Sequence, residues 1–213
     1  KRRPTCNRIS RIAALSYRYF HSFRDFNAKG DEVSVPQIKN DTYVDLFDVS
    51  ATYAVTPRLS LTLELPIQYG SRTNAAEHDG VHVHTMRAAG IGDMRLTANV
   101  FVLDPAKYPD QNISLGFGVK APTGDDAVKD TSFRPSGPEQ RAVDPAIDPG
   151  GGGWSIMLTG TAFAKVYNNT LLYASGLYLI NPNETNGAHP INFAVPPAPG
   201  GAAAITAASL QGQ

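Results

Sequence analysis

The sequence lacks several features that would define other classes of protein. Its single cysteine, Cys6, can form neither an internal disulfide nor a cysteine-based zinc cluster. It contains no run of about 18 apolar residues, which excludes a transmembrane helix. The formal net charge is zero, so nothing in the charge balance favours a nucleic acid as partner. Nine Tyr, nine Phe, 19 Gly and 16 Pro are present instead, a mixture that suits strands and turns better than helices.

Apolar and polar residues alternate in three segments, which predicts strands with one apolar and one polar face. These segments are 58–69, 94–102 and 113–120. Weaker alternation predicts four more strands at 14–23, 43–55, 154–166 and 171–180. Asp45 has the parity of its apolar neighbours, which suggests a bulge or an interfacial position. Leu172 and Tyr178 fall on the supposed polar side of the last strand, so the facing of that strand stays open.

The predicted connections alternate between short and long. Short links occur at 56–58, 104–111 and 167–169, whereas long links occupy 24–41, 70–90, 121–153 and the chain from 181 onward. In an antiparallel meander alternate links lie at opposite ends, so all long loops fall on one side. This layout is typical of an up-and-down outer-membrane β-barrel with tight periplasmic turns and long external loops. We therefore expect an all-β, antiparallel transmembrane barrel wall.

The two faces of the predicted strands have different chemistry. We expect the apolar face to contact outer-membrane lipid and the polar face to line a water-filled lumen. The residues predicted to face lipid are Leu59, Leu61, Leu63, Leu65, Ile113, Leu115 and Phe117. Those predicted to line the lumen are Glu64, Asp93, Arg95, Lys120 and Lys165. The alternative is a soluble antiparallel β-sandwich or small β-barrel that binds a ligand or a partner, with the same charges on a solvated outer face.

Five motifs in order resemble a known family. They read SYRYFHSFRDFN, TYAVTPRLSLTLELPIQYGSR, HTMRAAGIGDMRL, ISLGFGVKAPTGDD and RAVDPAIDPGGGGWSI. This ordered set resembles the outer-membrane transporters associated with the meta-cleavage pathway of phenol degradation. The resemblance implies a barrel in the bacterial outer membrane that helps hydrophobic or aromatic compounds cross, with no catalytic residues and no cofactor. The family-like glycines and prolines of these motifs are interpreted as architectural.

The ends of the chain depart from this pattern. Residues 1–13 form an atypical basic segment that is not an intact secretory signal, residues 14–187 are expected to form the barrel wall, and residues 188–213 are low in complexity. Seven strands are an odd number, whereas bacterial single-chain barrels have even counts. We therefore expect a truncated or frame-disrupted product, and whether it closes as given stays open. The solute and the oligomeric state are not predicted.

Other chemistry finds little support in the sequence. His78, His82 and His84 are weak candidates for a metal site, but a hydrated external loop explains them more simply, so no metal is predicted. The sequence has no nucleophile elbow, phosphate-binding loop, dinucleotide fingerprint or metalloprotease motif. We therefore expect a protein that is not an enzyme.

Overall fold

The computed structural model describes residues 11–24, 29–32, 41–79 and 82–182, and these residues form ten strands without a helix. The strands are β1 (Arg11–Ser22), β2 (Asp41–Ala54), β3 (Leu59–His78), β4 (Val83–Ile91), β5 (Arg95–Phe101), β6 (Gln111–Lys120), β7 (Lys129–Arg134), β8 (Gly137–Ala142), β9 (Ser155–Tyr167) and β10 (Thr170–Ile180). All seven predicted strands are present, and β1 begins three residues before the expected start of the wall at residue 14. No helix long and apolar enough to cross a membrane occurs among these residues.

One antiparallel sheet contains eight of the described strands. Its order is β1-β2-β3-β5-β6-β9-β10, and β4 also pairs with β3. β4 and β5 share one position in the sheet, because β3 pairs first with β5 (Glu64 opposite Arg95) and then with β4 (Ile67 opposite Ile91). Between β4 and β5 the ladder is interrupted at 92–94, where the Gly92 amide still donates to the Pro66 carbonyl at 2.8 Å. β1 and β10 are the outer strands of this sheet.

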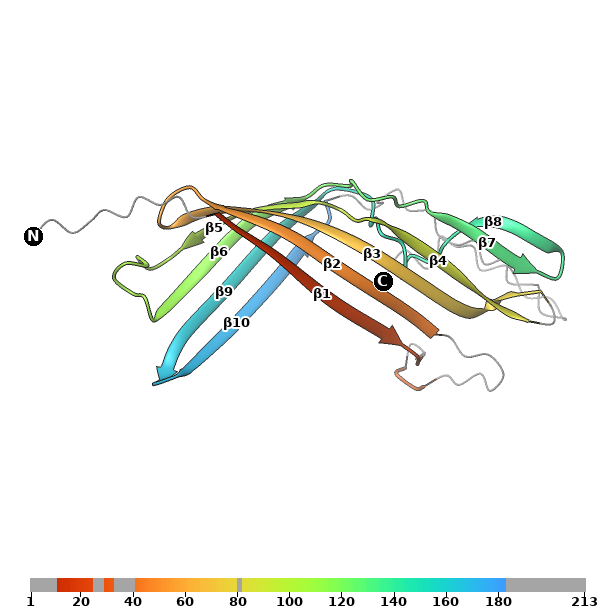
Figure 1. Cartoon of the computed structure of the whole chain (residues 1–213), viewed down its shortest axis with the longest axis horizontal. Coiled ribbons are helices and arrows are strands. Elements are labelled where there is room, and N and C mark those ends of the chain that lie inside the picture. The colour runs from red at the N-terminus through yellow and green to blue at the C-terminus, as the bar shows by residue number, and fades with distance from the viewer. Residues whose placement is uncertain (1–10, 25–28, 33–40, 80–81, 183–213) are drawn as a thin grey trace, which may run out of the picture.

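The sheet is curled into an arch (Figure 1). Side chains from strands as far apart as β3 and β10 line one hollow of about 380 Å³, so the face that carries Thr62 and Glu64 is the concave one. The alternate residues of β3, including Leu61 and Leu63, therefore point to the convex face and are 39% and 47% exposed. This arrangement confirms the predicted all-β antiparallel architecture.

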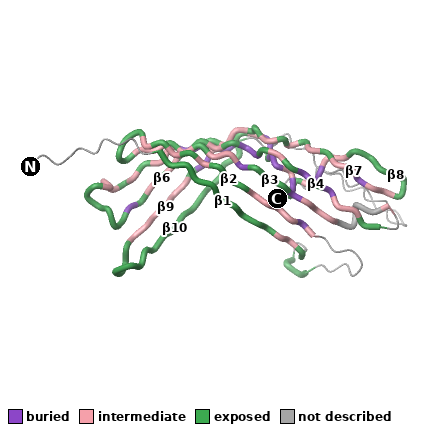
Figure 2. The backbone as a smooth tube through the Cα atoms, viewed as in Figure 1, coloured by how far each residue is buried: buried purple, intermediate pink, exposed green. Residues whose placement is uncertain are grey.

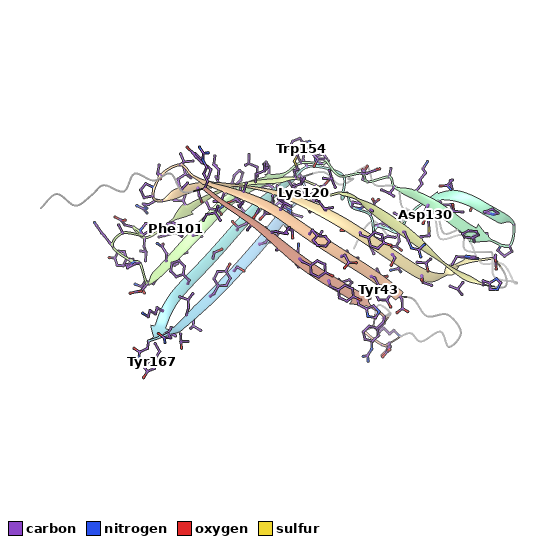
Figure 3. All side chains as sticks on the ribbon, in the orientation of Figure 1. Tyr43, Phe101, Lys120, Asp130, Trp154 and Tyr167 are labelled. Atoms are coloured by element: carbon purple, nitrogen blue, oxygen red, sulfur yellow. The ribbon has the colours of Figure 1, made fainter. Side chains whose placement is uncertain are left out.

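The three short connections lie together at one end of the arch, as the alternation predicts; the predicted long connections at 24–41 and from 181 onward lie largely outside the described residues. The turns at 55–58, 102–110 and 168–169 lie at the left in Figure 1, whereas the ends of β1, β3 and β6 lie toward the right. Tyr167, at the β9–β10 turn, and Asp130, in the segment after β6, mark the two ends in Figure 3.

The predicted loop at 70–90 is wrong. β3 continues to His78 and β4 starts at Val83, so the region is a tall hairpin and not an irregular loop. Asp45 was expected at a bulge or an interfacial position. β2 has no bulge there, since Asp45 pairs in register with Tyr69, and its Oδ1 accepts a 2.6 Å hydrogen bond from the Tyr17 hydroxyl. The interfacial position stays a prediction. The open question about β10 is resolved by its register, which places Leu172 and Tyr178 beside Ala164 and Leu158 on the convex side.

The long connection at 121–153 is also more ordered than an external loop. It contains the β7–β8 hairpin, and Val143 and Ile147 after that hairpin are 1% and 0% exposed. These two residues pack with Met86 and Ala88 of β4 to form the buried apolar cluster of the described residues. Figure 2 shows buried residues gathered around β3 and β4, while β1 and β10 are exposed along most of their length. The main apolar core is therefore the contact between this segment and the wall.

Candidate functional site: the concave face and the Asp93 junction

A band of charged residues crosses the concave face. Glu64, Arg95 and Lys120 stand in one row because β3, β5 and β6 pair these residues directly. Arg95 Nη1 lies 3.5 Å from Glu64 Oε2, and Arg95 Nη2 lies 3.6 Å from Asp48 Oδ1. Asp48 also accepts a 2.7 Å hydrogen bond from Arg18 Nη2. The structure thus places Glu64, Arg95 and Lys120 side by side on the concave face and adds two charges that the sequence analysis missed; that these residues line a lumen stays a prediction.

Asp48 and Arg18 were not predicted because the alternation of apolar and polar residues is weak in their segments. Asp48 belongs to the segment 43–55, whose alternation was obscured by Asp45 on the opposite face. Pairing of Asp48 with Pro66 and of Arg18 with Leu46 puts both on the concave side. The one available signal was parity with Glu64 across an assumed register, and the sequence does not supply a register.

A row of neutral polar side chains runs beside the charged band. The Thr52 and Thr62 hydroxyls are 3.0 Å apart, Asn99 Nδ2 donates to Thr62 Oγ1 at 3.5 Å, and Thr159 Oγ1 donates to Asn99 Oδ1 at 3.3 Å. This last bond passes over β6 because Gly116 has no side chain: a Cβ there would lie 2.1 Å from Thr159 Oγ1. Hydroxyl and amide groups therefore cross the concave face from β2 to β9 without a break.

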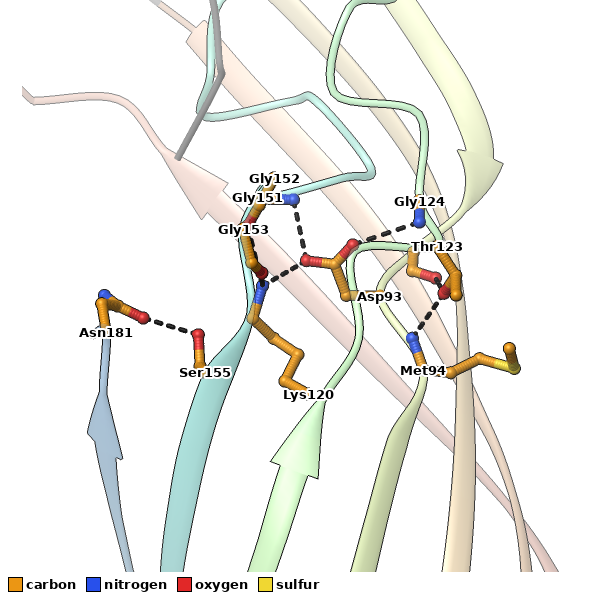
Figure 4. Close-up of polar contacts among 11 residues, drawn as sticks. Asp93, Met94, Lys120, Thr123, Gly124, Gly151, Gly152, Gly153, Ser155 and Asn181 are labelled. Atoms are coloured by element: carbon orange, nitrogen blue, oxygen red, sulfur yellow. Dashed lines mark hydrogen bonds and ion pairs between the residues drawn. The ribbon is translucent and has the colours of Figure 1, made fainter. Parts of the chain in front are cut away.

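Asp93 is the most buried charged group of the described residues, with 6% of its surface exposed. It lies in the interruption between β4 and β5. Its Oδ1 accepts a hydrogen bond from the Gly124 amide at 3.1 Å, and its Oδ2 accepts one from the Gly151 amide at 3.1 Å and pairs with Lys120 Nζ (Figure 4). A buried carboxylate requires such compensation, since an unpaired charge in this environment would be strongly unfavourable.

Three sequence motifs meet at this point, which we call the Asp93 junction: Gly92-Asp93, Thr123-Gly124 and Gly150-Gly151. Thr123 Oγ1 accepts from the Met94 amide at 2.8 Å and donates to the Gly92 carbonyl at 3.3 Å. The glycines permit contact between backbones, because a Cβ on Gly124 would lie 2.7 Å from the Gly150 Cα atom. The interpretation of these motifs as architectural did not foresee that they are one site.

The remaining predicted residues lie away from this site. Lys165 has the parity of the concave face but sits next to the β9–β10 turn and is exposed, so it does not join the charged band. Leu61, Leu63, Ile113, Leu115 and Phe117 lie exposed on the convex face, and Leu59 and Leu65 share that face and are half-buried.

The histidine candidates form no metal centre within the described part of the chain. His84 Nε2 lies 3.1 Å from Asp79 Oδ2, and its ring stacks on Phe133 of β7 at 4.0 Å. His82 Nδ1 lies 3.7 Å from the same carboxylate oxygen. The side chain of His78 lies outside the described residues. Where side chains are described, no group of three or more potential ligands is arranged to hold an ion.

Comparison with known proteins gives a likeness at the level of structure. No protein-family model matches the sequence, and no curated protein matches it. Among solved structures the chain is similar to an outer membrane channel from Pseudomonas putida F1, with a TM-score of 0.47 and 20% sequence identity over 80% of this chain. The chain spans 56% of the length of that channel. The resemblance to transporters of phenol degradation stays a prediction.

Proposed function

We propose that this chain forms wall strands of a bacterial outer-membrane channel that passes small, hydrophobic or aromatic organic compounds. The observation that carries the proposal is the distribution of side chains over the curled sheet. Large apolar residues are exposed along the convex face of the middle strands, including Phe47, Leu63, Leu96, Leu115, Phe117 and Leu158. Polar residues occupy the opposite face of the same strands. In water a continuous apolar surface of this kind is unfavourable, whereas in lipid it is the required outer surface.

Strand length and pairing agree with a position in a membrane. A tilted strand needs about 9–11 residues to cross the hydrocarbon. β1, β2, β6, β9 and β10 have 12, 14, 10, 13 and 11 residues. Hydrocarbon also demands that backbone groups be hydrogen-bonded, and the continuous ladders β1–β2, β2–β3 and β5–β6 meet this demand over much of the sheet.

The chemistry of the concave face favours a solute that is neutral and partly apolar. Its charged band contains three basic groups (Arg18, Arg95, Lys120) and three acidic groups (Asp48, Glu64, Asp93) that pair with one another, so it presents no excess of either sign. Next to the row of hydroxyl and amide groups, β10 contributes the exposed apolar side chains of Leu177 and Leu179. A small aromatic alcohol could pack its ring on such leucines and bond its hydroxyl to the polar row.

The rival function is a soluble sandwich or barrel that binds a ligand or a partner. A soluble sheet with this convex surface would need a second layer to cover it. No described strand packs on the convex face of the middle strands. The observation therefore favours the membrane proposal, and a single experiment separates the two.

Expression with a secretory signal, followed by cell fractionation, tests the location. We expect the protein in the outer-membrane fraction and soluble only with detergent. After reconstitution into liposomes, the vesicles should swell in arabinose and should admit phenol faster than protein-free vesicles. Recovery as a detergent-free soluble protein, or liposomes that admit arabinose no faster than empty ones, would contradict the channel proposal.

A further inference from the structure

The segment 121–153, which joins β6 to β9, is held at both of its ends by one carboxylate. Near its start the Gly124 amide donates to Asp93 Oδ1, and near its end the Gly151 amide donates to Asp93 Oδ2, each at 3.1 Å. Lys120, the last residue before the segment, pairs with the same carboxylate and donates to the Gly152 carbonyl at 3.3 Å. The entry and exit of the segment are therefore fixed to the wall at one point (Figure 4).

The wall is shaped to receive this segment. A Cβ on Gly92 would lie 2.9 Å from the Pro149 carbonyl, and a Cβ on Gly70 would lie 2.6 Å from the Ile147 Cβ. Gln68 Nε2 donates to the Asp148 carbonyl at 3.2 Å, and Arg72 Nε lies 3.1 Å from Asp144 Oδ2. The segment thus follows the concave face of β3 over several residues and does not project away from the wall.

The docked segment also takes up space within the arch. Pro149 and Gly151 line a hollow of about 340 Å³ together with Leu46 of β2 and Leu177 and Leu179 of β10. These strands lie on opposite sides of the sheet order, so the hollow spans the inside of the arch. Displacing Pro149 and Gly151 from the wall would change the width of this space.

We propose that Asp93 is a specificity-determining positioning residue: by holding the two ends of the segment 121–153 against the wall, it sets the largest solute that passes. This inference rests on the proposed channel function. Asp93 acts here through the segment and need not contact the solute. The carboxylate suits this role because hydrogen bonds to a charged group are stronger than those between neutral groups.

The test compares Asp93→Ala with Gly150→Ala in reconstituted liposomes. The first change removes the carboxylate; the second parts the ends of the segment sterically, since a Cβ at Gly150 would lie 2.7 Å from the backbone of Gly124 and Asp125. Swelling rates are measured in arabinose, glucose, sucrose and raffinose. We expect both variants to raise the raffinose-to-arabinose ratio, and for Asp93→Ala the increase should be about tenfold, the factor that corresponds to losing one such hydrogen bond. Trypsin cleavage after Lys129 and Arg141 should accelerate by a similar factor.

Asp104→Ala is the matched control. Asp104 caps the β5–β6 turn at the opposite end of the strands, where its Oδ1 accepts from the Ala106 amide at 3.0 Å. This variant should keep the size limit of the parent protein. An unchanged limit in both test variants, or failure of both to insert where the control inserts, would overturn the role of Asp93 in size selection. Absence of swelling in the parent protein would instead overturn the channel proposal itself.

Discussion

At the scale of single residues, Asp148 is an ionisable group outside the main strands whose pKa is clearly shifted. Its Oδ1 is buried without a hydrogen-bond partner among the described residues. Burial, together with the nearby charges of Asp125 and Asp126, raises its pKa to about 6, although the Gly150 amide opposes the change. The folded protein therefore binds this proton more tightly than the unfolded chain does. The stabilisation is complete below about pH 4 and is lost as the pH rises through about 6.

This sign predicts a pH-dependent effect of Asp148→Asn. The variant should be more stable than the parent at pH 8, where Asp148 is charged, by on the order of 1 kcal/mol, because partial exposure screens much of the full electrostatic effect. The difference should disappear at pH 4. Urea unfolding of the protein in lipid vesicles at both values measures it, with Asp104→Asn as control. An equal gain at pH 4 and pH 8 would mean that shape, not charge, is responsible.

The chemistry of individual positions was partly predictable. Parity alone placed Glu64, Arg95 and Lys120 on one face, because each lies in a strand whose alternation is regular. The partners of Asp93 could not be predicted in this way, since they are backbone amides of Gly124 and Gly151, which carry no sequence signal of pairing. Residue type indicates what a side chain can bond, while the bond itself depends on which segments meet.

At the scale of elements, the end of β3 was predicted too early, at residue 69 and not at His78. The reason is again that the sequence does not show which segments meet. The alternation of apolar residues stops at Tyr69, because beyond it the inner face is covered by protein. On the concave face Gly70 packs against Ile147 from a segment far along the chain. On the convex face the apolar row gives way to polar residues, where Thr73 pairs with Thr85 of β4 through a 2.6 Å hydroxyl contact. A strand that is covered in this way needs no period of two, so the pattern predicted a loop.

The fit between β5 and β6 supplies a test at this scale. Gly118 pairs with Thr97, and a Cβ there would lie 2.7 Å from the Leu96 carbonyl, a backbone atom that no rotamer change can move. We expect Gly118→Ala to lower the free energy of unfolding by about 1–3 kcal/mol, as overpacking does. Unfolding in lipid vesicles can be followed by the fluorescence of Trp154, the one tryptophan of the chain.

Gly176→Ala is the matched control for this change. Gly176 lies in β10, where a methyl group would point into open space. Alanine there should therefore leave the free energy of unfolding equal or raise it by about 0.4–1 kcal/mol, because it restricts the unfolded chain. Equal behaviour of the two alanine variants would show that β5 and β6 do not approach as closely as described.

At the scale of the whole molecule, the distribution of apolar residues inverts that of a soluble protein. The few fully buried apolar side chains lie where the segment 121–153 meets the wall, whereas many large ones are exposed on the sheet. A fold of this kind gains little stability from apolar side chains buried in its own interior, so its stability depends on the medium that covers the exposed ones. If that medium is lipid, the two faces of a single strand should respond oppositely to charge.

Adjacent residues of β6 offer this comparison. Leu115 is 57% exposed on the convex face, and Ser114 points to the concave face, where it pairs with Thr161. In lipid vesicles Leu115→Arg should lower the free energy of unfolding by about 2–4 kcal/mol, as arginine does near the middle of a bilayer. Ser114→Arg should cost much less, because its guanidinium stays hydrated among the polar residues. Equal losses would contradict a lipid-facing convex surface, and a larger loss for Ser114→Arg would assign the hydrated side to the opposite face.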